Sequence, residues 1–319
     1  MTQVEENTDP GQARPEAIKA VPVRHPGRWV AVAVLAVLTA MFVHMLVTND
    51  AFRWAFIIDN AFRPNVIEGV RTTVTLTVLA MVIGITLGTV FAVMRLSPNP
   101  ILRSAAWLYT WFFRAVPRLV LAILFGNLAI LYQTVRFGFP FDRQIAGLLG
   151  VDIDGTIFSI DARTFLSGFI AGLLALALSE GAYMAEIVRA GILSVNPGQN
   201  EAAQALGMSR MLTMRRIVLP QAMRVIIPPT GNETIAMLKD TSLVAFVPVT
   251  NELFFRLQAV GTRTFQVFPM LVAACVWYLM LTSVLLVAQY FIERYFARGT
   301  ASARAGMRLR ALGGAGGEH

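Results

Sequence analysis

Six long apolar segments alternate with shorter polar stretches along the chain. They cover roughly residues 28–48, 68–95, 106–135, 164–191, 219–250 and 269–292. Each segment exceeds the ~20 residues that a helix needs to cross the ~30 Å hydrocarbon core of a bilayer. The pattern therefore predicts an all-α membrane protein with about six transmembrane helices.

The composition agrees with a place in the membrane. Hydrophobic residues make up 56% of the 319-residue chain and charged residues only 14%, whereas soluble domains carry about 25% charged residues. The net charge of +8 comes from arginines at the ends of apolar segments rather than on one soluble face, which argues against nucleic acid as a partner. If the N-terminus is cytoplasmic, inner segments hold 18 of the 27 basic residues and outer segments hold 8. The positive-inside rule then predicts a multi-pass protein, surrounded by lipid, with both termini in the cytoplasm.

The chain lacks residues that several enzyme classes require. A phosphate-binding P-loop needs Gly-Lys-Ser/Thr, and neither lysine, Lys19 or Lys239, follows a glycine. The three histidines are scattered. The single cysteine, Cys275, allows neither a disulfide within the chain nor a cysteine-based metal site. We therefore expect no enzyme activity, no catalytic residue, no metal and no cofactor in this chain.

The fifth apolar segment combines helix-disrupting residues with charges. Pro228-Pro229 removes two backbone donors, which predicts a broken span. Glu233, Lys239 and Asp240 lie at membrane depth, where charges are costly unless they face protein or a water-filled cavity. We expect this segment to line an interior space. Lys239 and Asp240 would neutralise each other, pair with a neighbouring helix, or shape a cavity for a zwitterion.

The fourth segment also contains an acidic residue. Glu180 lies three residues before Tyr183, so the two share one helical face. The carboxylate either recognises an ammonium or a cationic side chain, or is a hydrogen-bonded acid packed between helices. The candidate solute-path residues are Glu180, Tyr183, Asn232, Glu233, Lys239, Asp240, Thr241 and Ser242.

Two shorter patterns predict helix contacts. Gly84 and Gly88 place two small residues on one helical face, which lets a neighbouring helix approach closely in lipid. Glu186 and Arg189 are three residues apart near the end of the fourth segment, and we expect them to form an ion pair.

A loop at about 192–220, between the fourth and fifth apolar segments, carries a pattern of fixed spacing. Glu201-Ala202-Ala203 is followed by Gly207 and then by Ile217-x-Leu219-Pro220. This pattern resembles the cytoplasmic coupling loop of bacterial ABC importer permeases. Further motifs extend the resemblance to the polar amino-acid branch of that family, over about residues 66–298. They include Gly69-Val70-x-Thr72-Thr73, Ala182-Tyr183-x-Ala185-Glu186, Gly231-Asn232-Glu233 and Leu238-Lys239-Asp240-Thr241-Ser242-Leu243.

Three features depart from the family pattern. Arg114-Ala115-Val116-Pro117 stands where the family usually has Arg-Gly-Thr-Pro. Arg118 follows where an apolar residue is common. The helix expected at 28–48 is additional to the common five-helix core. The first two departures bear on the identity of the solute rather than on the class of protein.

The resemblance implies a domain order and partners. A disordered cytoplasmic tail (1–27) and the extra helix (28–48) would precede the transmembrane domain (66–298), and a flexible cytoplasmic tail (299–319) would follow it. Short cytoplasmic coupling helices would contact the ATPase through Glu201, Ala202, Ala203, Gly207 and Pro220. The partners implied are two ABC ATPase subunits that bind ATP and Mg, a second permease copy or a paralogue, and an extracytoplasmic solute-binding protein.

The function implied is the permease subunit of an ATP-driven amino-acid importer in the bacterial plasma (inner) membrane. Two alternatives stay open from the sequence. One is an importer of another small polar solute, such as an opine or an amino-acid derivative. The other is a non-transporting membrane scaffold or signalling protein of the same fold.

Overall fold

The structure is a computed structural model that describes residues 26–131, 134–139, 155–161, 168–247 and 251–297, and a few positions between 141 and 150. The two predicted tails lie almost wholly outside these residues. The helices are α1 (Pro26–Thr48), α2 (Trp54–Ala61), α3 (Pro64–Leu96), α4 (Pro100–Ala115), α5 (Arg118–Leu131), α8 (Gly168–Leu193), α9 (Pro197–Ala205), α10 (Arg210–Thr213), α11 (Leu219–Asp240), α12 (Leu253–Thr264) and α13 (Val267–Ala297).

The all-α prediction is confirmed apart from one small sheet. Strand β1 (Thr134–Gly138) pairs with β2 (Thr156–Asp161) in antiparallel register, with Phe137 opposite Phe158. Short 3-10 turns at Asp50–Phe52 and Thr241–Phe246 join helices.

Four described helices are long and apolar enough to cross a membrane. They are α1, α3, α8 and α13, and the bent pair α4 and α5 makes a fifth candidate if it is one span. Helix α11, which carries Arg224 and the charges of the fifth apolar segment, is not among them. Of the roughly six transmembrane helices that the sequence predicts, four or five are therefore supported by the described residues. Helix α1 falls in a separate unit, Met1–Asp50, and nearly all of its side chains are exposed.

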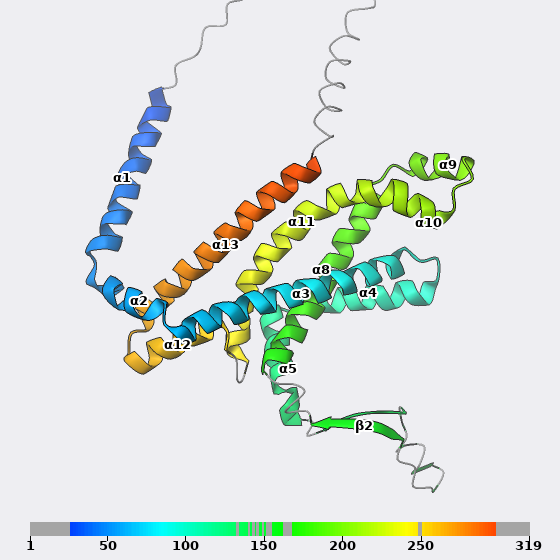
Figure 1. The fold of residues 1–319 in the computed structure, drawn as a ribbon, viewed down its shortest axis with the longest axis horizontal. Helices are drawn as coiled ribbons and strands as arrows, with labels where there is room; N and C mark the ends of the chain where they lie inside the picture. The colour runs from blue at the N-terminus through cyan, green and yellow to red at the C-terminus, as the bar shows by residue number, and fades with distance from the viewer. Residues whose placement is uncertain are drawn as a thin grey trace, which may run out of the picture. The chain divides into compact units, whose positions relative to one another are not determined.

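The predicted third segment, 106–135, is not one straight helix. Helices α4 and α5 meet at an angle of 100°. Pro117 explains the break, because a proline disfavours the helical conformation of the residue before it, and Val116 is extended with φ −86° and ψ 127°. Figure 1 shows α4 beside α3, with α5 turning away at the bend.

The predicted break at Pro228-Pro229 is wrong, because α11 stays helical through both prolines. The Thr230 hydroxyl donates to the Ile226 carbonyl at 2.8 Å, and the Gln289 amide of α13 reaches the Pro228 carbonyl at 3.5 Å. Neither bond reaches the carbonyls of Arg224 and Val225, which lose their helical donors at the two prolines, so α11 accommodates that loss without a break in its helix.

The close contact predicted for Gly84 and Gly88 is confirmed between α3 and α8. A Cβ atom placed on Gly84 would lie 2.6 Å from Cγ of Glu180, and one on Gly88 would collide with Met184. The missing side chains therefore let α8 lie directly against α3 (Figure 1). Glu180 lies at this contact, beside Gly84.

Candidate functional site

Arg118 is the first residue of α5, immediately after the bend, and its guanidinium meets three carboxylates. Its nitrogens lie 2.9 Å from Glu180 Oε2, 2.5 Å from Asp240 Oδ2 and 3.6 Å from Glu233 Oε2. The Tyr183 ring lies beneath the guanidinium, with its centroid 4.9 Å from Cζ. We call these five residues the Arg118 cluster. It joins α5, α8 and α11.

Helix geometry explains why these side chains converge. Glu180 and Tyr183 are three residues apart on α8, and Glu233 and Asp240 are seven apart on α11, so each pair shares one face of its helix. The bend before α5 then places Arg118 between the two faces. No run of neighbouring residues contains the cluster, although every member comes from a predicted apolar segment.

The cluster is closed on one side and partly open on the other. Glu180 is fully buried, and the Arg118 side chain is 12% exposed, whereas those of Glu233 and Asp240 are 26% and 34% exposed. One oxygen of Glu180, Oε1, is buried without a hydrogen-bond partner among the described residues. The cluster thus holds more negative than positive charge and retains unused acceptor capacity. Such an arrangement suits a cation.

A cavity of about 480 Å³ reaches the cluster at the ring of Tyr183. This volume falls within the range of roughly 300–1,000 Å³ that is typical of small-molecule sites. The lining residues are Arg95, Trp107, Thr110, Trp111, Arg114, Ala115, Tyr183 and Glu186. The predicted ion pair of Glu186 and Arg189 forms on its border at 2.7 Å, and Arg95 adds a second contact to Glu186 at 3.4 Å.

The other predicted solute-path residues lie elsewhere. Lys239 is exposed, and Asp240 pairs with Arg118 of α5 rather than with Lys239. Of the alternatives for this pair, Asp240 therefore shows the pairing with a neighbouring helix and not neutralisation by Lys239. The hydroxyls of Thr241 and Ser242 donate to backbone carbonyls of the preceding turn, those of Leu238 and Lys239. These two residues belong to the 3-10 turn that follows α11 rather than to the cluster.

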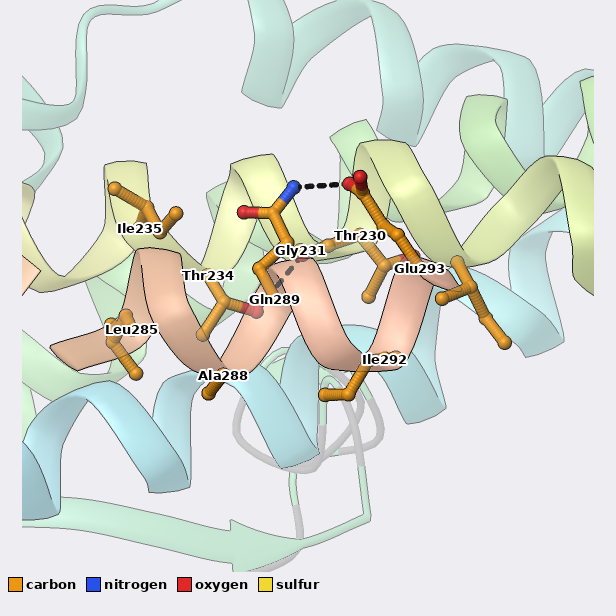
Figure 2. A pocket seen from close by; sticks show the side chains of 10 residues that line it. Thr230, Gly231, Thr234, Ile235, Leu285, Ala288, Gln289, Ile292 and Glu293 are labelled. Atoms are coloured by element: carbon orange, nitrogen blue, oxygen red, sulfur yellow. Dashed lines mark hydrogen bonds between the residues drawn. The ribbon is translucent and has the colours of Figure 1, made fainter. Parts of the chain in front are cut away.

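Asn232 faces α13 instead. Its side-chain oxygen accepts from the Gln289 amide at 2.9 Å, and the same amide nitrogen lies 2.6 Å from Glu293 Oε1. Figure 2 shows the pocket of about 280 Å³ beside these groups, between α11 and α13. Its wall is largely aliphatic, with Ile227, Ile235, Leu285 and Ile292 among the lining residues.

A second buried carboxylate, Glu252, was not foreseen from the sequence. It caps α12, accepting from the backbone amides of Phe254 at 2.7 Å and Phe255 at 3.4 Å. Its other oxygen accepts from the hydroxyls of Thr73 at 2.8 Å and Tyr278 at 2.5 Å. Burial raises the pKa of the Glu252 carboxyl above its ordinary value, and these hydrogen bonds oppose the rise.

The loop between α8 and α11 is ordered by conventional helix signals. Asn196 and Ser209 cap α9 and α10 by accepting from Gly198 and Leu212, respectively. Between the two helices, Gly207 has φ +73°, a left-handed conformation that glycine adopts without strain. A five-residue π-helix, Met214–Val218, leads directly into α11.

This loop has an inner and an outer face. Ala203 is buried, while Glu201 is exposed. Leu206 and Met211 are 81% and 77% exposed, although both side chains are apolar. An ordered loop that presents apolar side chains outward has the character of a docking surface.

The described residues offer no group of three or more histidine, cysteine or acidic side chains arranged around a metal ion. The residues that sequence reasoning missed are Arg118 as a site residue, its hydrogen-bond partner Ser179 and the separate Glu252. Pro117 was an available signal, because a proline followed by arginine within an apolar run indicates a bend with a charge at its inner side.

Sequence and structure comparisons agree on the class of protein. The profile of the family described as "Binding-protein-dependent transport system inner membrane component" matches residues 80–298. An arginine transport system permease protein of Corynebacterium glutamicum, ArgU, is 43% identical over 309 residues, which cover 96% of this chain and 92% of that protein. A putative glutamine transport system permease protein of Rickettsia typhi, GlnP, is 33% identical over 70% of this chain and 89% of its own length.

A solved structure agrees with the sequence relatives. A crystal structure of an amino acid ABC transporter with histidines matches with a TM-score of 0.57 and 31% identity, covering 73% of this chain and 94% of that one. The protein belongs to the binding-protein-dependent transport system inner membrane component family. It is a multi-pass permease subunit of the ABC transporter class, as its motifs indicated.

Proposed function

We propose that this chain forms the solute path of an ATP-driven amino-acid importer and that its solute is a cationic amino acid. The observation that carries the proposal is the Arg118 cluster, in which three carboxylates face one guanidinium over an aromatic ring. A second cation would balance the remaining negative charge, and a charge inside the membrane is stable only with such a partner. The name of the arginine permease that is 43% identical supports the same solute class.

The transport cycle follows from this assignment. A solute-binding protein would deliver the amino acid from outside, and a pair of ATPase subunits would bind ATP and Mg on the cytoplasmic side. This chain, with a second copy or a paralogue, would alternate between outward and inward openings. The protein would lie in a bacterial inner membrane with both termini on the cytoplasmic side, as the distribution of arginines predicts.

The loop of α9 and α10 would couple the permease to the ATPase. Its exposed apolar residues, Leu206 and Met211, would enter the ATPase surface, and its buried Ala203 would hold the loop to the membrane helices. Glu201, Ala202, Gly207 and Pro220 complete the proposed coupling set. The direct connection to α11, which carries Glu233 and Asp240, would transmit movement of the ATPase to the Arg118 cluster.

Uptake into proteoliposomes tests the solute class. The permease, its ATPase and its binding protein would be reconstituted and supplied with ATP, and uptake of radiolabelled L-arginine, L-lysine and L-glutamine would be compared. We expect arginine or lysine to be taken up at least ~10-fold faster than glutamine, because a charge-assisted contact contributes roughly 1.5–3 kcal/mol. Faster uptake of glutamine would contradict a cationic solute. ATP hydrolysis without uptake of any amino acid would favour a non-transporting role.

Gly207→Asp tests the coupling role. A Cβ atom at Gly207 meets no atom within 4 Å, so a side chain there causes no clash within the chain, although any substitution strains the backbone at φ +73°. We expect normal membrane insertion but loss of ATP-driven uptake, and Gly207→Ala is the matched control for backbone strain at positive φ. Full uptake by well-expressed Gly207→Asp would remove this loop from the ATPase interface.

A further inference from the structure

Arg118 occupies the acidic site in the manner of a bound ligand. Its guanidinium donates to Glu180 at 2.9 Å and to Asp240 at 2.5 Å, and its Nε donates to the Ser179 hydroxyl at 3.2 Å. It also lies over the Tyr183 ring. Paired carboxylates and an aromatic face are the groups that recognise a guanidinium. The site therefore already contains one guanidinium, the same kind of group that it would bind in a cationic solute.

The position of Arg118 distinguishes it from an arginine in the middle of a helix. It begins α5 directly after the extended Val116 and Pro117, at the 100° bend. The neighbouring cavity of about 480 Å³ shares the Tyr183 ring with the cluster. Arg114, one turn earlier on α4, already points its guanidinium at the same ring from 5.6 Å. A guanidinium displaced from the carboxylates thus has space and an aromatic surface beside it.

We propose that Arg118 is a tethered competitor of the solute. It pairs with the carboxylates while the site is empty, and the cationic group of the incoming amino acid replaces it at Glu180 and Asp240. The inference rests on the proposed function and extends it to selectivity. A neutral amino acid carries an α-ammonium but no net positive charge, so exchanging it for Arg118 leaves more negative charge in the site, and the competitor disfavours neutral solutes.

The competition has a measurable consequence. When a site is available for only a fraction of the time, the apparent dissociation constant rises by the inverse of that fraction. Removing Arg118 should therefore tighten binding of a cation, whereas removing an ordinary binding residue weakens it. The opposite signs separate the tethered competitor from a fixed part of the site.

The test compares Arg118→Ala with the unaltered permease in the assembled transporter. L-Arginine binding would be measured calorimetrically in nanodiscs, and thermal unfolding would be followed with and without methylguanidinium. We expect Arg118→Ala to bind L-arginine about 10-fold more tightly. Its unfolding temperature should be lower than that of the unaltered permease, and methylguanidinium should raise it back. Tetramethylammonium, which cannot donate hydrogen bonds, should restore much less.

Arg114→Ala is the matched control, because Arg114 contacts the same ring but forms no ion pair with the three carboxylates in the described part of the chain. It should gain no affinity for L-arginine. Arg118→Lys retains a charge without the planar fork and provides a second variant if Arg118→Ala fails to fold. It should tighten L-arginine binding by a smaller factor.

Weaker or unchanged L-arginine binding in both Arg118 variants would overturn the competitor model. Failure of the proposed function has a different signature. If the unaltered transporter takes up no cationic amino acid while methylguanidinium still restores Arg118→Ala, the guanidinium site stands and the assigned solute is wrong.

Discussion

The two fully buried glutamates, Glu180 and Glu252, are stabilised in opposite ways. Glu252 accepts four hydrogen bonds from uncharged donors, two hydroxyls and two backbone amides. Glu180 has one charged partner, Arg118, and one oxygen without a hydrogen bond among the described residues. The first site is complete within the chain, whereas the second depends on a charge that can be exchanged. Burial of an acid alone therefore does not identify a binding residue.

Glu252→Ala should have the largest effect on stability. It removes the cap of α12 and leaves the hydroxyls of Thr73 and Tyr278 without their acceptor. Loss of a cap costs about 1 kcal/mol, and each unsatisfied buried donor costs about 1–3 kcal/mol. We expect the free energy of unfolding to fall by about 3 kcal/mol, measured by thermal unfolding in detergent. Unchanged stability would show that the hydrogen bonds of Glu252 do not make it a structural acid, and the contrast with Glu180 would fail.

Glu180→Gln should affect selectivity more than stability. The amide keeps the size of the side chain but removes one negative charge, so Arg118 takes a larger share of the charge on Asp240 and Glu233. We expect the ratio of arginine to glutamine uptake to fall by roughly 10-fold, or about 1.4 kcal/mol. Basal ATP hydrolysis and folded yield serve as controls. A large loss of folded protein with an unchanged ratio would place Glu180 with Glu252 as a structural acid.

Tyr278→Phe should produce the smallest change. It removes one donor to Glu252 and leaves the ring, while Thr73 and two amides still hold the carboxylate. A single hydrogen bond contributes about 1 kcal/mol, so the decrease in stability should be near that value, with uptake selectivity unchanged. The double variant with Glu252→Ala should be less destabilised than the sum of the single changes, because both remove the same contact. Strict additivity would indicate that the bond is not formed.

The sequence predicted the local features best. The resemblance of the Glu201, Gly207 and Pro220 spacing to a coupling loop implied short helices, and α9 and α10 lie there. The spacing of Gly84 and Gly88 predicted a close helix contact, because two small residues four positions apart share one helical face. These patterns need no knowledge of which helices become neighbours.

The sequence predicted some members of the Arg118 cluster but not their pairing. Glu180, Glu233 and Asp240 stood out as charges in apolar segments, but Arg118 lies 62 and 122 positions from its closest partners along the chain. Because that pairing depends on the bend before α5, the sequence left open whether Asp240 pairs with the adjacent Lys239 or with a neighbouring helix. Tertiary contact, rather than sequence proximity, determined the ion pair.

Glu252 escaped notice for a different reason. It lies beyond the fifth apolar segment, where an acidic residue is expected to be in a loop and exposed to solvent. Only the approach of Thr73 and Tyr278 from α3 and α13 buries it. Pro228-Pro229 gave the converse error, because local chemistry predicted a break that α11 does not show.

The π-helix at Met214–Val218 joins the proposed coupling loop to the membrane helix that follows. A π turn closes its hydrogen bonds over five residues rather than four and so takes up one more residue than an α turn within about one turn. Deleting one of these five residues would therefore convert it to an α turn with little change in the direction of α10 relative to α11. Deleting one residue of α11 between Leu219 and Glu233 would instead rotate α10 by about 100° relative to Glu233 and Asp240. The π turn is thus the position in this connection where the chain length can change by one residue while Leu206 and Met211 keep their direction.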